Sequence, residues 1–195
     1  MTDNLRSRAL LSRQTSRLLI VDVQSKLLRI MQSPAGLEDA CRRLIDAATL
    51  LGIPVSATEQ YPKGLGHTVD SLKEGLGTPA EKLRFSSATS FEWMNDVAHG
   101  GRHQVVVAGM ETHVCITQTA LDLVARGFDV HVPADAVTAR KPLDHETALR
   151  RLQAEGCTIT TWESVLFEWC ETAEADEFKS ISKLVVQPPR TSNPT

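Results

Sequence analysis

The sequence lacks any long hydrophobic run, since none of its apolar stretches approaches the roughly 20 residues that a membrane-spanning helix needs. Aromatic residues make up only 5% of the 195 residues, and the net charge of −3 gives no overall attraction to nucleic acid. No GxGxxG or phosphate-loop pattern is present, so no nucleotide cofactor is predicted. These absences exclude a transmembrane protein and disfavour a nucleotide-dependent one.

Cysteine is also scarce, and its four copies show no regular spacing. They stand at Cys41, Cys115, Cys157 and Cys170. This arrangement fits neither a disulfide framework nor a zinc site, so a reducing, intracellular compartment is favoured over secretion. We therefore expect a cytoplasmic or mitochondrial protein.

What the sequence does contain is an alternation of apolar runs with amphipathic segments. Strands are expected to end near Asp22, Thr58, Phe85, Gly109, Val132 and Thr161, with helices at 37–51, 114–126 and 145–155. A glycine closes each of these helices just before the next strand begins. The pattern predicts an α/β fold: a single-domain, doubly wound, mostly parallel six-stranded sheet flanked by helices.

The two ends of the chain differ from its body. Residues 1–16 are read as a flexible basic lead-in, whose arginines are also compatible with a mitochondrial transit peptide. Residues 187–195 are rich in proline, serine and threonine and are expected to form a flexible tail. Residues 17–186 then make up the folded domain.

The most informative segment surrounds Cys115. A β-branched apolar run ends at Gly109, and helical spacing resumes so soon that a helix should begin near Thr112 or His113. Cys115 would lie in its first turn, where free N–H groups and the helix dipole lower the pKa of a thiol and can bind an oxyanion. The alternative is a buried structural cysteine that packs as a small hydrophobe.

Two charged residues fall at the same predicted edge of the sheet. Asp22 ends an apolar strand, at the edge where open parallel sheets bind ligands. Lys82 lies in a short strand or extended segment before a Ser/Thr-rich stretch that is expected to start a helix, and it would enter the same edge. Each has a structural alternative, since Asp22 could cap a helix or form a structural ion pair and Lys82 could be a solvated surface charge.

Together these segments resemble the isochorismatase-like cysteine hydrolases, in particular a metal-independent subgroup of uncertain substrate. The matching segments are the strand end at Asp22, 58–66, Lys82 with Phe85 and Ser86, 109–122, 134–137 and 163–167. The resemblance implies a catalytic triad, which falls on Asp22, Lys82 and Cys115. It also implies homo-oligomers.

The resemblance further implies an oxyanion hole made by the backbone N–H groups of Glu111 and Cys115, with a non-proline cis peptide between Met110 and Glu111. Cys115 would attack a small-molecule amide to form a thioester, while Asp22 moves the proton and Lys82 holds the ion pair. No cofactor is expected for this chemistry.

A metal site is not predicted. Nicotinamidases of this family carry an Asp and several His ligands after the second strand, where this chain has Thr58, Glu59, Gln60 and Tyr61. His67 is the only nearby histidine, and one His with one Glu provides too few ligands.

Residues near the predicted strand ends are candidates for the walls of a substrate pocket. They are Gln24, Tyr61, Phe91, Trp93 and Thr112. Each is equally explained by packing. His113 could shape the pocket, cap the helix or act as a base.

A second functional hypothesis is a nucleic-acid-processing or interaction protein, because kinetoplastid proteins described as mitochondrion-associated ribonucleases look similar to this family. Beyond the first 17 residues, however, basic residues are dispersed among acids rather than clustered with aromatic residues. A nucleic-acid partner is therefore not expected.

Overall fold

The computed structural model describes residues 6–96 and 101–188. Within these residues, seven strands form one parallel sheet in the order β3-β2-β1-β4-β5-β7, with β6 paired to the end of β4. The strands are β1 (Ser16–Val21), β2 (Val55–Gln60), β3 (Ala80–Lys82), β4 (Gln104–Met110), β5 (Asp129–Pro133), β6 (Val137–Thr138) and β7 (Thr158–Thr160). The doubly wound α/β prediction is confirmed, and the predicted six strands become seven because β6 is too short for periodicity to reveal.

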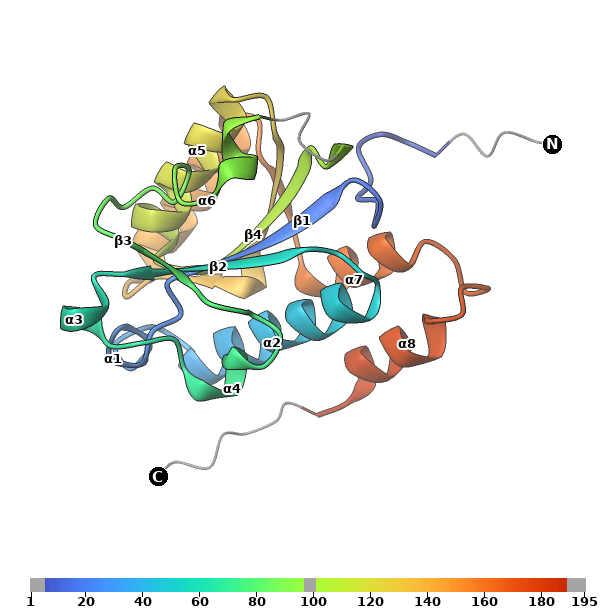
Figure 1. The fold of residues 1–195 in the computed structure, drawn as a ribbon, viewed down its shortest axis with the longest axis horizontal. Coiled ribbons are helices and arrows are strands. Elements are labelled where there is room, and N and C mark those ends of the chain that lie inside the picture. Colours follow the sequence, from blue (N-terminus) through green and yellow to red (C-terminus); the bar gives the residue numbers. More distant parts are fainter. Residues whose placement is uncertain (1–5, 97–100, 189–195) are drawn as a thin grey trace.

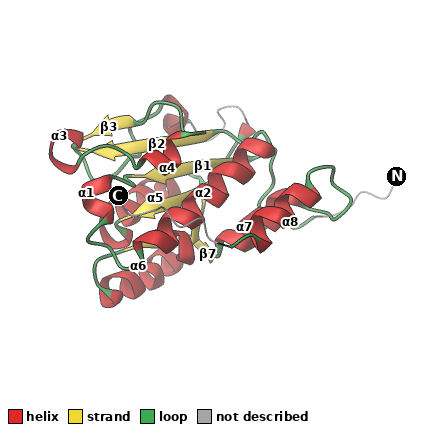
Figure 2. Cartoon of the chain, turned by 90° about the horizontal axis from the view of Figure 1, so that it is seen from below, coloured by secondary structure: helices red, strands yellow, loops and turns green. Residues whose placement is uncertain are grey.

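Helices cover both faces of the sheet (Figures 1 and 2). One face carries α2 (Pro34–Leu50), α7 (Trp162–Cys170) and α8 (Phe178–Val186), and the other carries α5 (Thr117–Ala125) and α6 (Pro142–Ala154). Shorter helices are α1 (Ser25–Leu28), α3 (Pro62–Leu65), α4 (Asp70–Lys73), 3₁₀ turns at Glu92–Asn95 and Ala134–Ala136, and a π-helical turn at Thr112–Ile116. The stretch after Lys82 starts no α-helix, contrary to the sequence-based expectation. None of the helices in the described part of the chain is long and apolar enough to cross a membrane.

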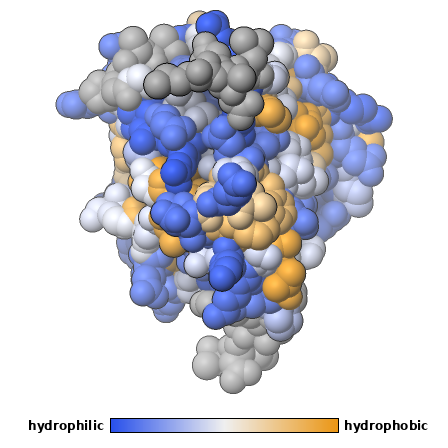
Figure 3. All heavy atoms as spheres, turned by 90° about the vertical axis from the view of Figure 1, so that its right-hand side faces the viewer, coloured by the Kyte–Doolittle hydropathy of each residue, from blue (hydrophilic) through white to orange (hydrophobic). Residues whose placement is uncertain are grey.

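The segment before β1 is packed against the body of the protein, at the end where the strands begin. Leu11 is fully buried, and its backbone N–H donates to the Glu168 carboxylate at 2.8 Å. Arg6 donates to the carbonyl oxygen of the same glutamate at 2.6 Å. Figure 3 views this end of the molecule, where hydrophilic residues surround smaller hydrophobic patches. Arg6 and Leu11 therefore attach the lead-in to α7, and the flexibility of the rest of the lead-in stays a prediction.

The chain end after α8 also makes a contact with the body. Arg43 of α2 donates to the carbonyl oxygen of Gln187 at 2.8 Å. The first residue of the predicted flexible tail is therefore hydrogen-bonded to α2. Residues 1–5 and 189–195 lie outside the described residues.

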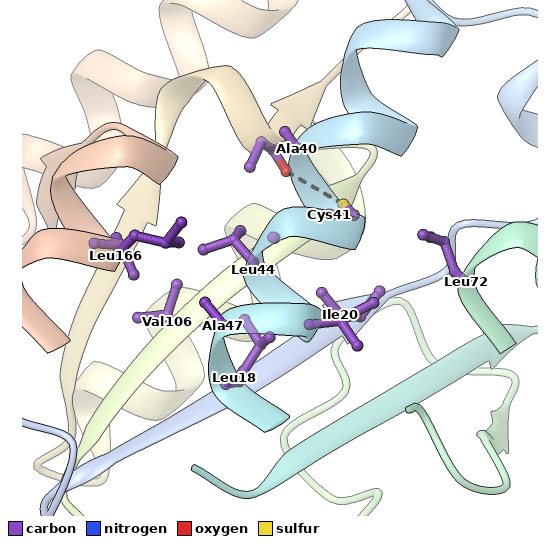
Figure 4. Packing of buried hydrophobic residues seen from close by; sticks show 14 of the residues in the cluster. Leu18, Ile20, Ala40, Cys41, Leu44, Ala47, Leu72, Val106 and Leu166 are labelled. Atoms are coloured by element: carbon purple, nitrogen blue, oxygen red, sulfur yellow. Dashed lines mark hydrogen bonds between the residues drawn. The ribbon is translucent and has the colours of Figure 1, made fainter. Parts of the chain in front are cut away.

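The core follows the alternation of side chains along the central strands. Leu18 and Ile20 of β1 face α2, whereas Leu19 and Val21 point to the opposite face, toward α5. Figure 4 shows the α2 side, where the Cys41 thiol points toward the carbonyl oxygen of Ala136 at 4.0 Å. Cys41 is fully buried and acts as a core residue.

The centre of the sheet brings two strand ends unusually close together. Gly109 of β4 has a φ of +120°, and a Cβ at this position would lie 2.1 Å from the carbonyl oxygen of Val21 in β1. Glycine is therefore required here, because any side chain would collide with the neighbouring backbone. The close approach places the residues after β4 directly beside Asp22, at the point where strand order reverses and open α/β sheets bind ligands.

Candidate active site

Asp22 lies immediately after β1 and is completely buried. Its φ of +56° is uncommon for a non-glycine residue, a type of strain that clusters at functional sites. The Thr58 hydroxyl donates to its Oδ1 at 2.8 Å, and Lys82 Nζ donates to its Oδ2 at 2.7 Å. A cation and a hydroxyl thus hold the two carboxylate oxygens in fixed positions.

Lys82 is the last residue of β3 and is only 8% exposed. Its Nζ lies 2.7 Å from Asp22 Oδ2 and 2.7 Å from Gln60 Oε1. The carbonyl oxygens of Arg84 and Phe85 lie at 3.2 and 2.9 Å. Four acceptors therefore surround an ammonium group that has three N–H bonds, so Lys82 is held as a fixed, buried charge.

Cys115 lies in the π-helical turn between β4 and α5 and is 5% exposed. Its thiol has hydrogen-bond interactions with both Asp22 and Lys82. The pKa of this thiol is raised to about 12: burial is the largest cause, the Asp22 charge acts in the same direction, and Lys82 opposes both. The lowered pKa expected from the helix terminus is therefore wrong, because desolvation outweighs the helix dipole.

A raised pKa changes the chemistry that this cysteine can perform. With a pKa of about 12, the resting thiol is protonated near neutral pH, so attack on an electrophile needs a base that removes its proton. Asp22 is the acidic group in contact with the thiol. The site therefore suits base-assisted attack rather than a preformed thiolate.

The turn that leads to Cys115 contains a cis peptide bond between Met110 and Glu111, at the position where the family resemblance placed one. Glu111 is 8% exposed, and its carboxylate accepts a hydrogen bond of 2.8 Å from Arg140 Nε. Thr112, which follows, is fully buried and its hydroxyl lies 3.0 Å from His145 Nδ1 on α6. Side chains from the loop after β6 and from α6 thus support the turn.

Two of the aromatic candidates lie away from this edge of the sheet. Trp93 Nε1 donates to Ser56 near the start of β2, and the Arg17 guanidinium at the start of β1 lies 5.0 Å from its ring centroid. Phe91 stacks on Trp93 with ring centroids 6.2 Å apart. These contacts support a packing role for both rings, and a role in the pocket stays a prediction.

Of the remaining pocket candidates, Gln24 has a structural role and Tyr61 lines a cleft. Gln24 is fully buried, and its side-chain amide is bonded to the backbones of Gln60 and Gly66, so it ties two loops together. Tyr61 is half exposed and lines a cleft of about 360 Å³ beside Lys82. A second cleft, of about 430 Å³, lies beside the residues that come next in the chain. It is lined by Arg84, Phe85, Ser86, Gln118, Leu121 and Asp122.

His113 faces α6, where its Nε2 lies 3.9 Å from Asp144. It also lines a shallow cleft of about 330 Å³ with Thr117 and Leu143. A role in the pocket or as a base stays a prediction, and the contact with α6 supports a structural role.

Sequence patterns missed four polar residues that organise the site. Thr58 and Gln60 on β2 bond to Asp22 and Lys82, Ser87 lies 3.3 Å from the Thr58 hydroxyl, and Arg140 pairs with Glu111. Alternation along β2 could have indicated that Thr58 and Gln60 share one face. The contact of Arg140 crosses 29 residues of sequence and leaves no local pattern.

A buried carboxylate next to the site binds a loop. Glu59 accepts hydrogen bonds from the backbone N–H and the hydroxyl of Thr68 at 2.6 and 2.7 Å, and lies 2.9 Å from His67 Nδ1. Within the described ranges, no group of three or more His, Cys, Asp or Glu side chains is placed to hold a metal ion.

Comparison with known proteins identifies the family. The model of the isochorismatase domain matches residues 16–164, from the start of β1 into α7. The chain belongs to the isochorismatase family. Isochorismatase domain-containing protein 2 of Danio rerio is 40% identical over 179 residues, which cover 91% of this chain and 90% of that protein. The chain spans only 62% of the length of isochorismatase domain-containing protein 1 from the same fish, which is also 40% identical.

Solved structures of similar proteins share the fold of this isochorismatase domain. The MAR1 ribonuclease of Caenorhabditis elegans superposes with a TM-score of 0.85 at 36% identity, over 93% of this chain and 95% of that one. YcaC from Pseudomonas aeruginosa, solved with hexane-2,5-diol and covalent acrylamide, gives a TM-score of 0.82 at 25% identity, over 93% and 94%. The family and its structural neighbours support a hydrolase.

Proposed function

We propose that this isochorismatase-family protein hydrolyses a small molecule at an amide-type C–N bond through a covalent thioester on Cys115. The observation that carries the proposal is the buried cluster in which one carboxylate, Asp22, contacts both a fixed ammonium group and the thiol. Three different strand ends supply these groups, so ordinary core packing does not require them to meet. A buried charge pair beside a cysteine is costly and is typical of a catalytic site.

The proposed reaction uses the three groups of this cluster and two backbone N–H groups. Asp22 takes the proton of Cys115 as sulfur attacks the carbonyl carbon, and the carbonyl oxygen becomes an oxyanion bound by the backbone N–H groups of Glu111 and Cys115. The intermediate collapses, the C–N bond breaks, and Asp22 returns its proton to the leaving nitrogen. Water, losing a proton to Asp22, then attacks the thioester, the C–S bond breaks to release a carboxylic acid, and Asp22 returns that proton to the Cys115 sulfur.

Lys82 does not need to exchange a proton in this scheme. Its hydrogen bonds to Gln60 and to two backbone carbonyls hold the ammonium group beside Asp22, and none of them involves the substrate. Its positive charge compensates the negative charge that develops on sulfur. The covalent acrylamide in P. aeruginosa YcaC supports the proposal, since it shows that a related protein carries a reactive nucleophile.

The test uses p-nitrophenyl acetate, an activated ester that needs no specific pocket. We expect the wild type to release a burst of about one p-nitrophenolate per chain and to gain an acetyl group, detected by intact mass and mapped to Cys115. Cys115→Ala should give neither, whereas Cys157→Ala, which removes another buried thiol, should keep both. Full acetylation of the Cys115→Ala variant would overturn the proposal.

The ribonuclease hypothesis is a second candidate because the C. elegans relative is named as one. Two arginines that could have attracted RNA are held in ion pairs, Arg6 with Glu171 and Arg13 with Glu177. We therefore expect weak RNA binding. Tight binding of a single-stranded oligonucleotide whose affinity falls steeply with salt would favour this hypothesis instead.

A further inference from the structure

The ion pair between Arg140 and Glu111 lies at the turn that precedes Cys115. Thr138 of β6 pairs with Met110 of β4, so the loop that carries Arg140 runs alongside the cis peptide. Arg140 Nε donates to Glu111 Oε2 at 2.8 Å. The glutamate is 8% exposed while the arginine side chain is 53% exposed, so an almost buried carboxylate is neutralised from the solvent side.

A carboxylate at this position is a disadvantage for the proposed reaction. The Glu111 N–H is one of the two proposed donors to the oxyanion, and only two methylene groups separate the Glu111 carboxylate from its own Cα. An uncompensated negative charge so close to the oxyanion would oppose its formation, because charges interact strongly where water is excluded. The turn therefore needs either a neutral side chain or a fixed cation.

We propose that Arg140 is a positioning residue that neutralises Glu111 and fixes the orientation of its peptide, so that the backbone N–H can stabilise the oxyanion. This inference rests on the proposed function, since it assigns a role within the same thioester mechanism. The contact with Glu111 raises the pKa of Arg140 above its ordinary value, so the guanidinium keeps its charge throughout the working range of pH.

The role of Arg140 can be separated from activation of the thiol. The pKa of the Cys115 thiol depends on burial and on the charges of Asp22 and Lys82. A substitution at Arg140 should therefore leave the thiol as reactive as before. It should slow only those reactions in which an oxyanion forms.

Two reagents make this distinction. Iodoacetamide alkylates sulfur by direct displacement and forms no oxyanion, whereas p-nitrophenyl acetate acylates sulfur through a tetrahedral oxyanion. Neither reagent carries a negative charge, so Arg140 cannot act by binding an anionic group of the substrate. The ratio of acylation rate to alkylation rate then reports oxyanion stabilisation alone.

We expect Arg140→Gln to lower this ratio by about 10- to 100-fold, less than or similar to the loss of an oxyanion-hole donor. The double variant Glu111→Gln with Arg140→Gln removes both charges and should recover most of the loss. Arg150→Gln is the matched control, because this exposed arginine of α6 donates to Thr147 in its own helix at 3.4 Å. Melting temperatures confirm that each variant is folded.

The outcomes separate the two proposals. If Arg140→Gln leaves the ratio within about twofold of wild type, the inference is wrong, even though Cys115 still reacts. If the double variant stays as slow as Arg140→Gln, Arg140 acts only by holding the loop, and neutralisation of Glu111 is excluded. If Cys115 of the wild type reacts with neither reagent, the proposed function itself fails.

Discussion

Two buried carboxylates lie on neighbouring strands of the sheet, Asp22 after β1 and Glu59 in β2, and their surroundings differ. Asp22 after β1 binds one hydroxyl and one buried ammonium group and contacts a thiol. Glu59 in β2 accepts a backbone N–H and a hydroxyl from Thr68 and pairs with His67, whose side chain is 69% exposed. Burial of the carboxylate alone therefore does not distinguish the proposed catalytic group from a structural one.

The difference lies in what each carboxylate holds. Glu59 fixes the loop between α3 and α4 through donors that belong to that loop, an arrangement whose benefit is stability. The Asp22 side chain instead contacts the Lys82 ammonium group and the Cys115 thiol, which come from other strand ends. We expect substitutions at Asp22 and Lys82 to change the reactivity of Cys115, and substitution of Glu59 to change stability alone.

The largest expected effect follows from removing the cation. Lys82→Met leaves the Asp22 carboxylate buried without its charge partner, which should lower the free energy of unfolding by about 3–5 kcal/mol. Urea denaturation measures this loss. Lys73→Met is the control, since this lysine is more than half exposed and pairs with an exposed aspartate. Equal stability of the two variants would show that Lys82 contributes no more than a surface charge.

Asp22→Asn should act on the thiol in the opposite direction to Lys82→Met. The Asp22 charge raises the pKa of Cys115 and Lys82 lowers it. Alkylation by iodoacetamide should therefore shift to lower pH in Asp22→Asn and to higher pH in Lys82→Met, with thiolate changing about tenfold for each unit of pKa. Turnover should nevertheless stop in Asp22→Asn because no group then moves the proton.

Glu59→Gln is the control for this experiment, because Glu59 does not contribute to the pKa of the thiol. Its alkylation profile should coincide with that of the wild type. Shifts of the Asp22 and Lys82 variants in the same direction would contradict the charge assignment in the cluster.

The sequence predicted those parts of the site that follow from local pattern. Apolar runs located the ends of β1 and β4, which placed Asp22 and Cys115 at one edge, and a short extended segment placed Lys82 at the same edge. The family resemblance joined these three residues into a triad. The extent to which the thiol is buried depends on α5 and on strands distant in sequence, so local pattern did not reveal it. The sequence therefore predicted a lowered pKa for the thiol, whereas its pKa in the structure is raised. The contacts of Trp93 were not predicted because the chain after β3 returns to the start of β2, a path that no local pattern records.

The lead-in shows the same limit in another region. Its composition suggested a flexible segment, yet the Leu11 side chain is buried. The Leu11 backbone N–H also donates to Glu168 of α7, a contact across 157 residues. Composition predicts whether a segment can form a core of its own. It does not predict whether the segment completes the core of another region.

The smallest expected effect concerns Glu59 and depends on pH. Burial raises the pKa of Glu59, but the hydrogen bonds from Thr68 and His67 outweigh it, and the net pKa is lowered. The folded state therefore binds fewer protons than the unfolded state, so this stabilisation is complete above the ordinary carboxyl pKa of about 4.3 and is lost as pH falls through the lower, folded-state pKa. Glu59→Gln should cost about 1–2 kcal/mol at pH 7. In thermal or urea unfolding, the difference from wild type should shrink between pH 5 and pH 3, and a constant difference over that range would mean that the charge of Glu59 does not bind the loop.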